Sequence, residues 1–595
     1  MAHIPLSGKF YWGLFLAAAT SLSVPVRAQT VGAATVAPDE NGVNMATGGV
    51  YSPPVASTGV SIGGAAAGGL SYFLTPDGGF NYNITDGSYY NYEIDDWVLG
   101  LVVTSGGKSE LFHISDAISP IYTYTPDRMY GSSLVYDTVQ HLFTYTGRDG
   151  TIVSYPNEVH CFISPAAPGE VASKVVRPSG EVLTLSYNTY IDSGCLYGRR
   201  LQDVSSSKGY KLRFNYASNT VGKPLNGSWG VMTSTQAINS SVDYCDPTSI
   251  TCPAFTQSWP QMTFSYPSGE TDVTGPDGRV SKTTWSGSTF SYFKGINSAA
   301  SISYQSTYVS GWPGYNVTRG TGVWTYSFSP IDQGFPSESF TATRIRPGGG
   351  QLTVFVPHNG DANIGSVTDE LGRITRYYYN TNKQLQYVVS PEGTIISDTP
   401  MFGYTKYEYD TRGNITGTTV VPKINSGLNN MITSAGFDTA CNNPKTCNQP
   451  NWVKDANGNQ TDFTYDANSG GVQSELRPAA AVGGVRSLKL TTYVPRNAMI
   501  KNASGALVQS PDAIRLPSTQ TDCQFAPGSN PPACDTSAPQ TLTTFEYGAS
   551  TTSEALLVKG IAVTSSANPG TTLRTCYTYD IYGRKISETT PLGGC

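Results

Sequence analysis

Charged residues are scarce in this chain of 595 residues, where they make up 13% of the sequence. Soluble domains usually carry about 25%. The formal net charge is −6, so no excess of positive charge is present for holding phosphates, and no nucleic-acid partner is predicted. Runs of strong helix formers are nearly missing, which argues against a mainly helical fold.

Reactive motifs are equally sparse. Five histidines occur, none at a metal-ligand spacing, and no G-x-S-x-G elbow is present. The segment "TSGGKSE" at 104–110 lacks the first glycine of a phosphate loop, because Val102 stands there. Glu93, Asp95 and Asp96 cluster, but adjacent strand residues point to opposite faces. We therefore predict no catalytic residue and no cofactor, and an enzyme is the weakest of three hypotheses.

Long apolar runs are missing after the first residues. "YWGLFLAAAT" at 11–20 is too short to span a bilayer, and "VRAQ" offers a cleavage site after Ala28. This predicts a signal peptide over 1–28, with an uncleaved anchor as the alternative. No integral membrane segment is expected after its removal. The expected location is secreted, periplasmic or at the cell surface.

Cysteine is present in an even number, ten, and several residues lie close together in polar loops. Such pairs fit disulfides in an exported protein, whereas zinc would need C-x-x-C units or nearby histidines. The predicted close pairs are Cys245 with Cys252, Cys441 with Cys447, and Cys523 with Cys534, and looser candidates are Cys161 with Cys195 and Cys576 with Cys595.

Glycine, proline and tyrosine are abundant, with 63, 38 and 38 residues. Short alternating stretches separated by Asp-Gly and similar turns predict an all-β fold built from antiparallel hairpins. We expect a Gly-rich first segment and N-terminal β region over 29–155. Degenerate β repeats with a Cys-clipped loop follow over 156–350, and clear repeats occupy 351–595.

The clear repeats are variants of one phrase. "YEYDTRGNITGT" at 407–418 and "YTYDIYGRKISET" at 577–589 are near copies, and "VTDELGRITRYYYN" at 367–380 and "VKDANGNQTDFTYD" at 453–466 match half of it. Alternation places the tyrosines on one strand face, Asp accepts backbone N–H groups in the turn, and Gly supplies positive φ. The tyrosine rings are expected to stack on cross-strand neighbours. The predicted structural residues are Tyr409, Asp410, Gly413, Tyr465, Asp466, Gly372, Gly458, Tyr579, Asp580 and Gly583.

One of these turns also resembles a calcium loop. Asp455, Asn457, Asn459 and Asp466 stand at loop offsets 1, 3, 5 and 12, but Gln460 replaces the required glycine. We interpret it as a repeat turn, with adventitious calcium binding as the alternative.

The quoted phrases resemble the YD (tyrosine-aspartate) repeats of the RHS family, strongly over 360–595 and weakly over 170–350. The resemblance implies a long β-sheet that spirals into a hollow shell, which in full-length members often encloses a C-terminal toxin released at an Asp-Pro-x-Gly segment. Asp246-Pro247 is followed by Thr-Ser, so self-cleavage does not transfer. The expectation is a partial array without the toxin, either because the sequence continues or because a following gene supplies the rest.

Two functions other than catalysis are therefore expected. The first is a non-enzymatic, exported, toxin-associated scaffold that presents or encloses a C-terminal effector or cargo. The second is a cell-surface module for carbohydrate binding or adhesion. It would use the aromatic segment 311–328, with Trp312, Tyr315, Trp324 and Tyr326, although such rings more often fill a core.

Overall fold

The computed structural model describes residues 39–46, 59–64, 68–73, 82–86, 100–106, 108–157, 170–192, 195–219, 227–294, 299–309, 312–330, 339–357, 363–481 and 483–591. Within these ranges the elements are β-strands, apart from one 3-10 turn, η2 (Gly227–Gly230). The all-β prediction is confirmed. The predicted signal peptide lies outside the described residues.

Strands that follow one another along the chain pair antiparallel and form one continuous sheet, which contains 37 strands among the described residues. Its first strands are β3 (Tyr82–Asp86), β4 (Gly100–Ser105), β5 (Lys108–Ile118), β6 (Ile121–Pro126), β7 (Ser133–Asp137), β8 (Leu142–Thr146), β9 (Ile152–Pro156), β10 (Glu170–Val171) and β11 (Lys174–Val176). A separate hairpin, β1 (Gly59–Ile62) with β2 (Leu70–Phe73), precedes them.

The early strands close on themselves. β3 pairs with β10, and after two residues the same stretch of chain becomes β11, which pairs with both β9 and β12. β3–β9 together with β10 and β11 therefore form a closed ring of strands, which we call the inner ring. In it β8 and β9 alternate between buried and half-buried residues, as strands with one face on a core should.

The rest of the sheet is a wall. It begins with β12 (Val182–Asp192), β13 (Cys195–Ser206), β14 (Tyr210–Tyr216), β15 (Met232–Asn239), β16 (Gln261–Ser265), β17 (Glu270–Thr274), β18 (Val280–Ser286), β19 (Thr289–Phe293), β20 (Ile302–Val309), β21 (Trp312–Arg319), β22 (Gly322–Pro330), β23 (Phe340–Ile345), β24 (Gln351–Val356), β25 (Ser366–Thr368) and β26 (Ile374–Tyr379).

It continues with β27 (Leu385–Ile396), β28 (Thr399–Tyr409), β29 (Ile415–Val421), β30 (Met431–Gly436), β31 (Trp452–Lys454), β32 (Gln460–Tyr465), β33 (Val472–Ala479), β34 (Arg486–Arg496), β37 (Ile514–Gln524), β38 (Thr541–Tyr547), β39 (Val558–Ser565), β40 (Asn568–Tyr579) and β41 (Lys585–Glu588). A hairpin outside the sheet, β35 (Met499–Lys501) with β36 (Leu507–Gln509), projects between β34 and β37.

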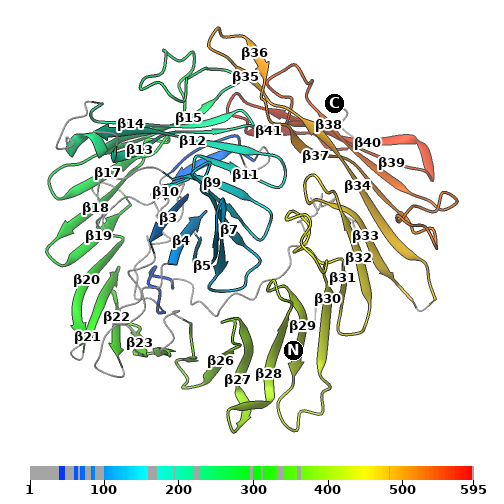
Figure 1. The fold of residues 1–595 in the computed structure, drawn as a ribbon, viewed down its shortest axis with the longest axis horizontal. Coiled ribbons are helices and arrows are strands. Elements are labelled where there is room, and N and C mark those ends of the chain that lie inside the picture. The colour runs from blue at the N-terminus through cyan, green and yellow to red at the C-terminus, as the bar shows by residue number, and fades with distance from the viewer. Residues whose placement is uncertain are drawn as a thin grey trace, which may run out of the picture.

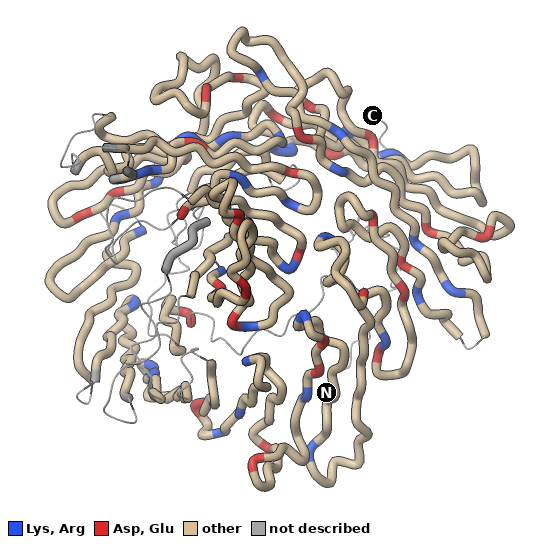
Figure 2. Tube along the Cα trace, viewed as in Figure 1, with Lys and Arg blue, Asp and Glu red and all other residues tan. Residues whose placement is uncertain are grey.

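The wall encircles the inner ring (Figure 1). The strands from β14 through β21, β28 and β33 run round the molecule, and β38–β41 return to the neighbourhood of β14 and β15. Charged residues of both signs are interspersed along this path (Figure 2). The expected long sheet that spirals is therefore present, and the inner ring lies within it.

Packing differs between the two halves of the wall. The largest hydrophobic core lies where β14 and β15 meet the inner ring and the β1–β2 hairpin. In contrast, every residue of β26 and of β29 is only half-buried. This part of the wall is one sheet thick, so its stability depends on the backbone ladder and on contacts at the strand ends. The predicted domain boundary at 155/156 falls within β9, and the one at 350/351 falls at the start of β24. The sheet is continuous at both places, and the two boundaries stay predictions.

Candidate functional site: the repeat turns and the seams they close

Four turns of the wall share one geometry over five residues, which we call the repeat turn: Asp, two variable residues, Gly, and Arg or Asn. In the turn that begins at Asp410, one carboxylate oxygen accepts the backbone N–H groups of Arg412 and Asn414, at 2.9 and 2.8 Å. The N–H of Gly413 donates to the Asp410 carbonyl, and Gly413 has φ of 78°. A side chain at that φ would be strained, which explains the glycine.

The residue after the glycine donates a side-chain hydrogen bond to the Asp carboxylate. Asn414 Nδ2 donates to the second carboxylate oxygen of Asp410 at 2.8 Å. Arginine does the same in the turn of Asp369, where Arg373 Nε lies 2.7 Å from the carboxylate. This hydrogen bond and the backbone donors lower the pKa of Asp369. The turns of Asp455 with Gly458 and Asn459, and of Asp580 with Gly583 and Arg584, repeat the pattern.

The tyrosine that precedes the turn joins neighbouring repeats. The hydroxyl of Tyr409 donates to the carbonyl of Leu385 at 2.5 Å, and that of Tyr579 donates to the carbonyl of Val558 at 2.8 Å. Tyr465 reaches the carbonyl of Pro450 in the same way, at 2.6 Å. Each bond spans 15 to 24 residues of sequence, so it ties one repeat to the preceding one. Burial raises the pKa of all three hydroxyls.

This hydroxyl bond was missed by the sequence analysis, which expected ring stacking. The rings of Phe463 and Tyr465 are stacked with centroids 6.4 Å apart, but both lie on β32, so they are not the expected cross-strand pair. The sequence signal was the choice of Tyr over Phe before the Asp, because only Tyr carries a donor.

Asp466 departs from the repeat turn although it follows a tyrosine. Its carbonyl accepts N–H groups from Ser469 and Gly470, and its carboxylate pairs with Arg515 of β37 at 2.7 Å. Asp455, the first residue of the calcium-like segment, uses its carboxylate for the backbone of Asn457 and Asn459. The two carboxylates thus have separate partners, as the repeat-turn interpretation expects.

Repeat turns also close a seam between the wall and the inner ring, which we call the first seam. Arg148, in the turn between β8 and β9, donates to the Gly413 carbonyl at 3.2 Å and to Asn414 Oδ1 at 2.6 Å. Gln384 of the wall donates to the carbonyl of Met129, in the loop between β6 and β7, at 2.8 Å. The shape of the repeat turn therefore places Gly413 against the loops of Met129 and Arg148 on the inner ring.

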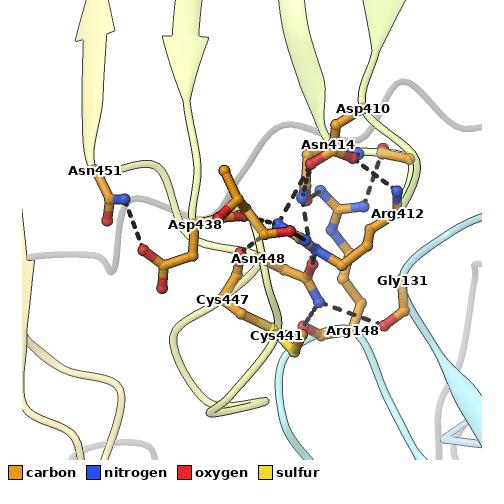
Figure 3. A network of polar contacts seen from close by, with 12 residues as sticks. Gly131, Arg148, Asp410, Arg412, Asn414, Asp438, Cys441, Cys447, Asn448 and Asn451 are labelled. Carbon is orange, nitrogen blue, oxygen red and sulfur yellow. Dashed lines mark hydrogen bonds and ion pairs between the residues drawn. A yellow bond between two sulfur atoms is a disulfide. The ribbon is translucent and has the colours of Figure 1, made fainter.

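The disulfide loop 441–447 completes the first seam (Figure 3). Asn448, which directly follows Cys447, donates to the carbonyls of Gly131 and Arg148 at 3.3 and 3.1 Å. Arg412 Nε donates to Asn448 Oδ1 at 3.2 Å, and its Nη1 and Nη2 donate to the carbonyls of Thr439 and Cys447. Asn414 and Asn448 are 0% and 5% exposed. Buried amides are costly unless they are bonded, so this polar network fixes the fit of ring and wall.

An ion pair supports the first seam from the side. Lys383 Nζ lies 2.9 Å from the carboxylate of Asp127, whose other neighbour is His113 Nε2 at 3.2 Å. Burial alone would raise the pKa of Asp127, but the hydrogen bonds from Lys383 and His113 outweigh it and hold the pKa below its usual value.

A second seam joins the last repeat turn to the start of the wall. The carbonyl of Tyr582 accepts the N–H of Gly63 at 2.7 Å, and that of Ile581 accepts Asn239 Nδ2 at 2.8 Å. The ring of Tyr582 meets that of Trp259 edge to face, with centroids 5.7 Å apart. Residues at the two ends of the repeat array are thus in contact, which brings the wall back to its own beginning.

The β35–β36 hairpin and the start of β37 strengthen this return. The N–H of Lys501 donates to the carbonyl of Ser240 at 2.7 Å, and that of Arg515 to Ser179 at 2.8 Å. The return therefore rests on several backbone bonds between residues more than 250 positions apart.

A short N-terminal segment, 39–46, is fixed to the wall at β20–β23. Tyr326 Oη donates to the carboxylate of Asp39 at 2.5 Å, and Arg344 lies 3.3 Å from the same carboxylate. Val43 and Met45 are fully buried beside these strands. The face that carries Tyr326 is thus occupied by the chain itself.

The described rings of the aromatic segment lie in a core. Tyr326 is fully buried, Tyr315 and Trp324 are half-buried in the same core, and the side chain of Trp312 lies outside the described residues. The most exposed tryptophan in the described part is Trp285, at 68%.

The three close cysteine pairs are bonded, with Cα atoms 5.0, 4.9 and 5.7 Å apart: Cys245 with Cys252, Cys441 with Cys447, and Cys523 with Cys534. Cys576 is also disulfide-bonded. Cys161, Cys595 and the side chain of Cys195 lie outside the described residues, as do Glu93, Asp95 and Asp96. In the described part of the chain, no helix has the length and apolar character to cross a membrane.

No family model and no curated protein matches the chain. Solved structures do match, at low similarity. A crystal structure of TcdB2-TccC3 without its hypervariable C-terminal region matches 82% of this chain and 27% of that chain, with 13% identity and a TM-score of 0.32. A Tc holotoxin pore of Photorhabdus luminescens matches 93% and 37%, with 10% identity and a TM-score of 0.24. The N-terminal domain of SpvB from Salmonella typhimurium matches 40% and 92%, with 9% identity and a TM-score of 0.23. The chain thus spans about a third or less of the two toxin chains.

Proposed function

We propose that the protein is a non-enzymatic, exported scaffold whose curved wall encloses or presents a partner polypeptide, such as a C-terminal effector. The single observation that carries the proposal is the second seam, where Tyr582 in the last repeat turn contacts Gly63 of the β1–β2 hairpin and Trp259, which lies between β15 and β16 near the start of the wall. A wall that returns to its own beginning separates an inside from an outside. The partner polypeptide is proposed on the motif resemblance to RHS proteins.

The side chains at the seams support a scaffolding role. Asp410 holds Asn414 within the turn, while Asn414 and Asn448 bond Arg148 and Gly131 of the loops on the inner ring. Such groups hold surfaces together, and none of them is assigned a reacting role in this proposal. The disulfides fit an oxidising compartment outside the cytoplasm.

The proposal is tested by protease protection. The chain is expressed with the polypeptide encoded directly downstream of it, and digestion of that polypeptide is followed over time. We expect protection with the natural wall and reduced protection with Tyr582→Ala, which weakens the second seam by removing the ring contact with Trp259. Tyr308→Ala, at a side chain that is 76% exposed, is the control. Equal digestion with the natural wall and with Tyr582→Ala would refute enclosure.

One specific observation supports the alternative function, carbohydrate binding. Trp285 is 68% exposed, and its ring lies 4.6 Å from that of Phe290 on the next strand. Exposed paired rings can stack on a sugar. Binding on a glycan array that is lost with Trp285→Ala would favour this function, and an array without binding would remove it.

A further inference from the structure

A cavity of about 280 Å³ lies beside β13–β15, under the loop closed by the disulfide Cys245–Cys252. This volume is near the lower end of the range for small-molecule sites. Polar side chains form much of its lining: Arg200, Gln202, Arg213, Asn215, Asn219 and Gln236. The rings of Tyr216 and Phe255 also border it.

Arg200 is the unusual residue of this lining. Its guanidinium is stacked between the rings of Tyr216 and Trp229, at 4.3 and 4.6 Å, and the residue is 7% exposed. It donates to the carbonyls of Ser218 and Trp229 and to the side-chain oxygen of Asn219. These acceptors are all neutral, and no carboxylate in the described part of the chain forms an ion pair with it. Buried cations normally have an anionic partner.

The surroundings of Arg200 are also rich in buried positive charge. Lys211 and Arg213 are 5% and 1% exposed. The single carboxylate that pairs with them in the described residues is Asp203, 3.1 Å from Lys211 and 3.8 Å from Arg213. Lys211 and Arg213 otherwise bond carbonyls of the disulfide loop, and half-buried Asp246 of that loop is the next acidic group. The described residues of this region therefore include three buried cations and one buried carboxylate.

Two residues of the lining each keep one donor without an acceptor. The Nε atoms of Arg200 and Arg213 are buried without an acceptor among the described residues. An unsatisfied buried donor costs on the order of 1–3 kcal/mol, and more for a charged group. Burial also lowers the pKa of both guanidinium groups, in the direction expected for cations that lack full compensation.

We propose that this cavity binds a small organic carboxylate of about the size of one acidic sugar. A carboxylate is an anion that guanidinium groups bind well, and it would supply the negative charge missing near Arg200 and Arg213. The amides of Asn215, Asn219 and Gln236 border the same space and can bond hydroxyl groups, while the ring of Tyr216 offers an apolar face. The site is independent of whether the wall encloses a partner.

The test is calorimetry of the full chain with sodium glucuronate and with glucose, which share a ring and differ in the carboxylate. We expect saturable one-to-one binding of glucuronate, weakened by added salt, and no binding of glucose at the same concentrations. Inorganic phosphate is a separate arm of the experiment. Binding of phosphate without glucuronate would overturn the carboxylate class, and saturation by neither would overturn the site.

Two variants locate the site. Arg200→Lys keeps the charge but loses the fork, and we expect glucuronate affinity to fall at least about tenfold. Gln236→Leu removes an amide at similar volume and should weaken binding severalfold, which preserves the test if Arg200→Lys does not fold. Arg279→Lys, at a side chain 84% exposed outside the cavity, is the matched control. Natural affinity in folded Arg200→Lys and in Gln236→Leu would overturn the assignment.

Discussion

Replacing Gly413 by alanine should destabilise the protein more than the same change at Gly458, although both glycines stand at the same position of the repeat turn. Their φ angles are 78° and 82°, so the conformational strain of alanine, about 1–2 kcal/mol, is common to both. A methyl group on Gly458 would meet no atom within 4 Å, whereas one on Gly413 would overlap the carbonyl of Met129. The difference between the two variants therefore isolates the first seam.

The extra cost follows from the bonds that the overlap would break. If the loop of Met129 retreats, the bond from Gln384 Nε2 to its carbonyl is lost, and so is that from Arg148 to the Gly413 carbonyl. Each lost hydrogen bond contributes about 1 kcal/mol, and the bond from Arg148 to neighbouring Asn414 should be partly lost as well. Gly413→Ala should therefore cost roughly 2–3 kcal/mol more than Gly458→Ala.

The measurement is a urea unfolding curve for each variant, together with hydrogen exchange. Exchange is needed because a wall of stacked repeats can open locally before it unfolds as a whole. We expect faster exchange at residues 129–131 in Gly413→Ala alone. If the two variants lose equal stability and 129–131 stay equally protected, the reasoning about the first seam is wrong.

Three further predictions concern the tyrosines and the N-terminal segment. Tyr409→Phe removes the bond to the Leu385 carbonyl and should cost about 1 kcal/mol in urea unfolding, whereas exposed Tyr308→Phe should cost nothing. Burial raises the pKa of Tyr493 to about 12 from about 10 in the unfolded chain, so its contribution is full below pH 10 and is lost as the pH rises toward 12. Circular dichroism across that range should record falling stability, and a flat profile would contradict it. Asp39→Asn removes the charge that pairs with Arg344, and the rate of proteolysis within 39–46 should rise several-fold. An unchanged cleavage rate would show that this ion pair does not hold the segment to the wall.

The hairpin unit was predictable because its determinants are local. Asp410 and Gly413 lie three residues apart, and backbone sterics at positive φ leave little choice but glycine. The same holds for the disulfides of the close pairs, where six to eleven residues separate the sulfurs. Alternation of tyrosine with polar residues likewise identifies a strand without reference to the rest of the chain.

The partners of these units were not predictable. Nothing near Asn448 in the sequence indicates that its amide bonds Gly131 and Arg148, some 300 residues earlier. Likewise, the repeat turns of Asp455 and Asp410 are alike in sequence. Gly413 of the second turn lies against the carbonyl of Met129, whereas Gly458 of the first has no such neighbour. The buried cations around Arg200 were not predictable, because they are spread over two strands and become neighbours only through strand pairing and the overlying loop.

The sequence by itself determined the strands, the turns and their repetition, since each depends on the torsion angles and hydrogen bonds of a few adjacent residues. The tertiary structure alone decided that the early strands close into a ring, that the wall curves round it, and which turns become seams. Curvature accumulates from small twists between many successive strands, so the place where the wall meets itself is a property of the whole array.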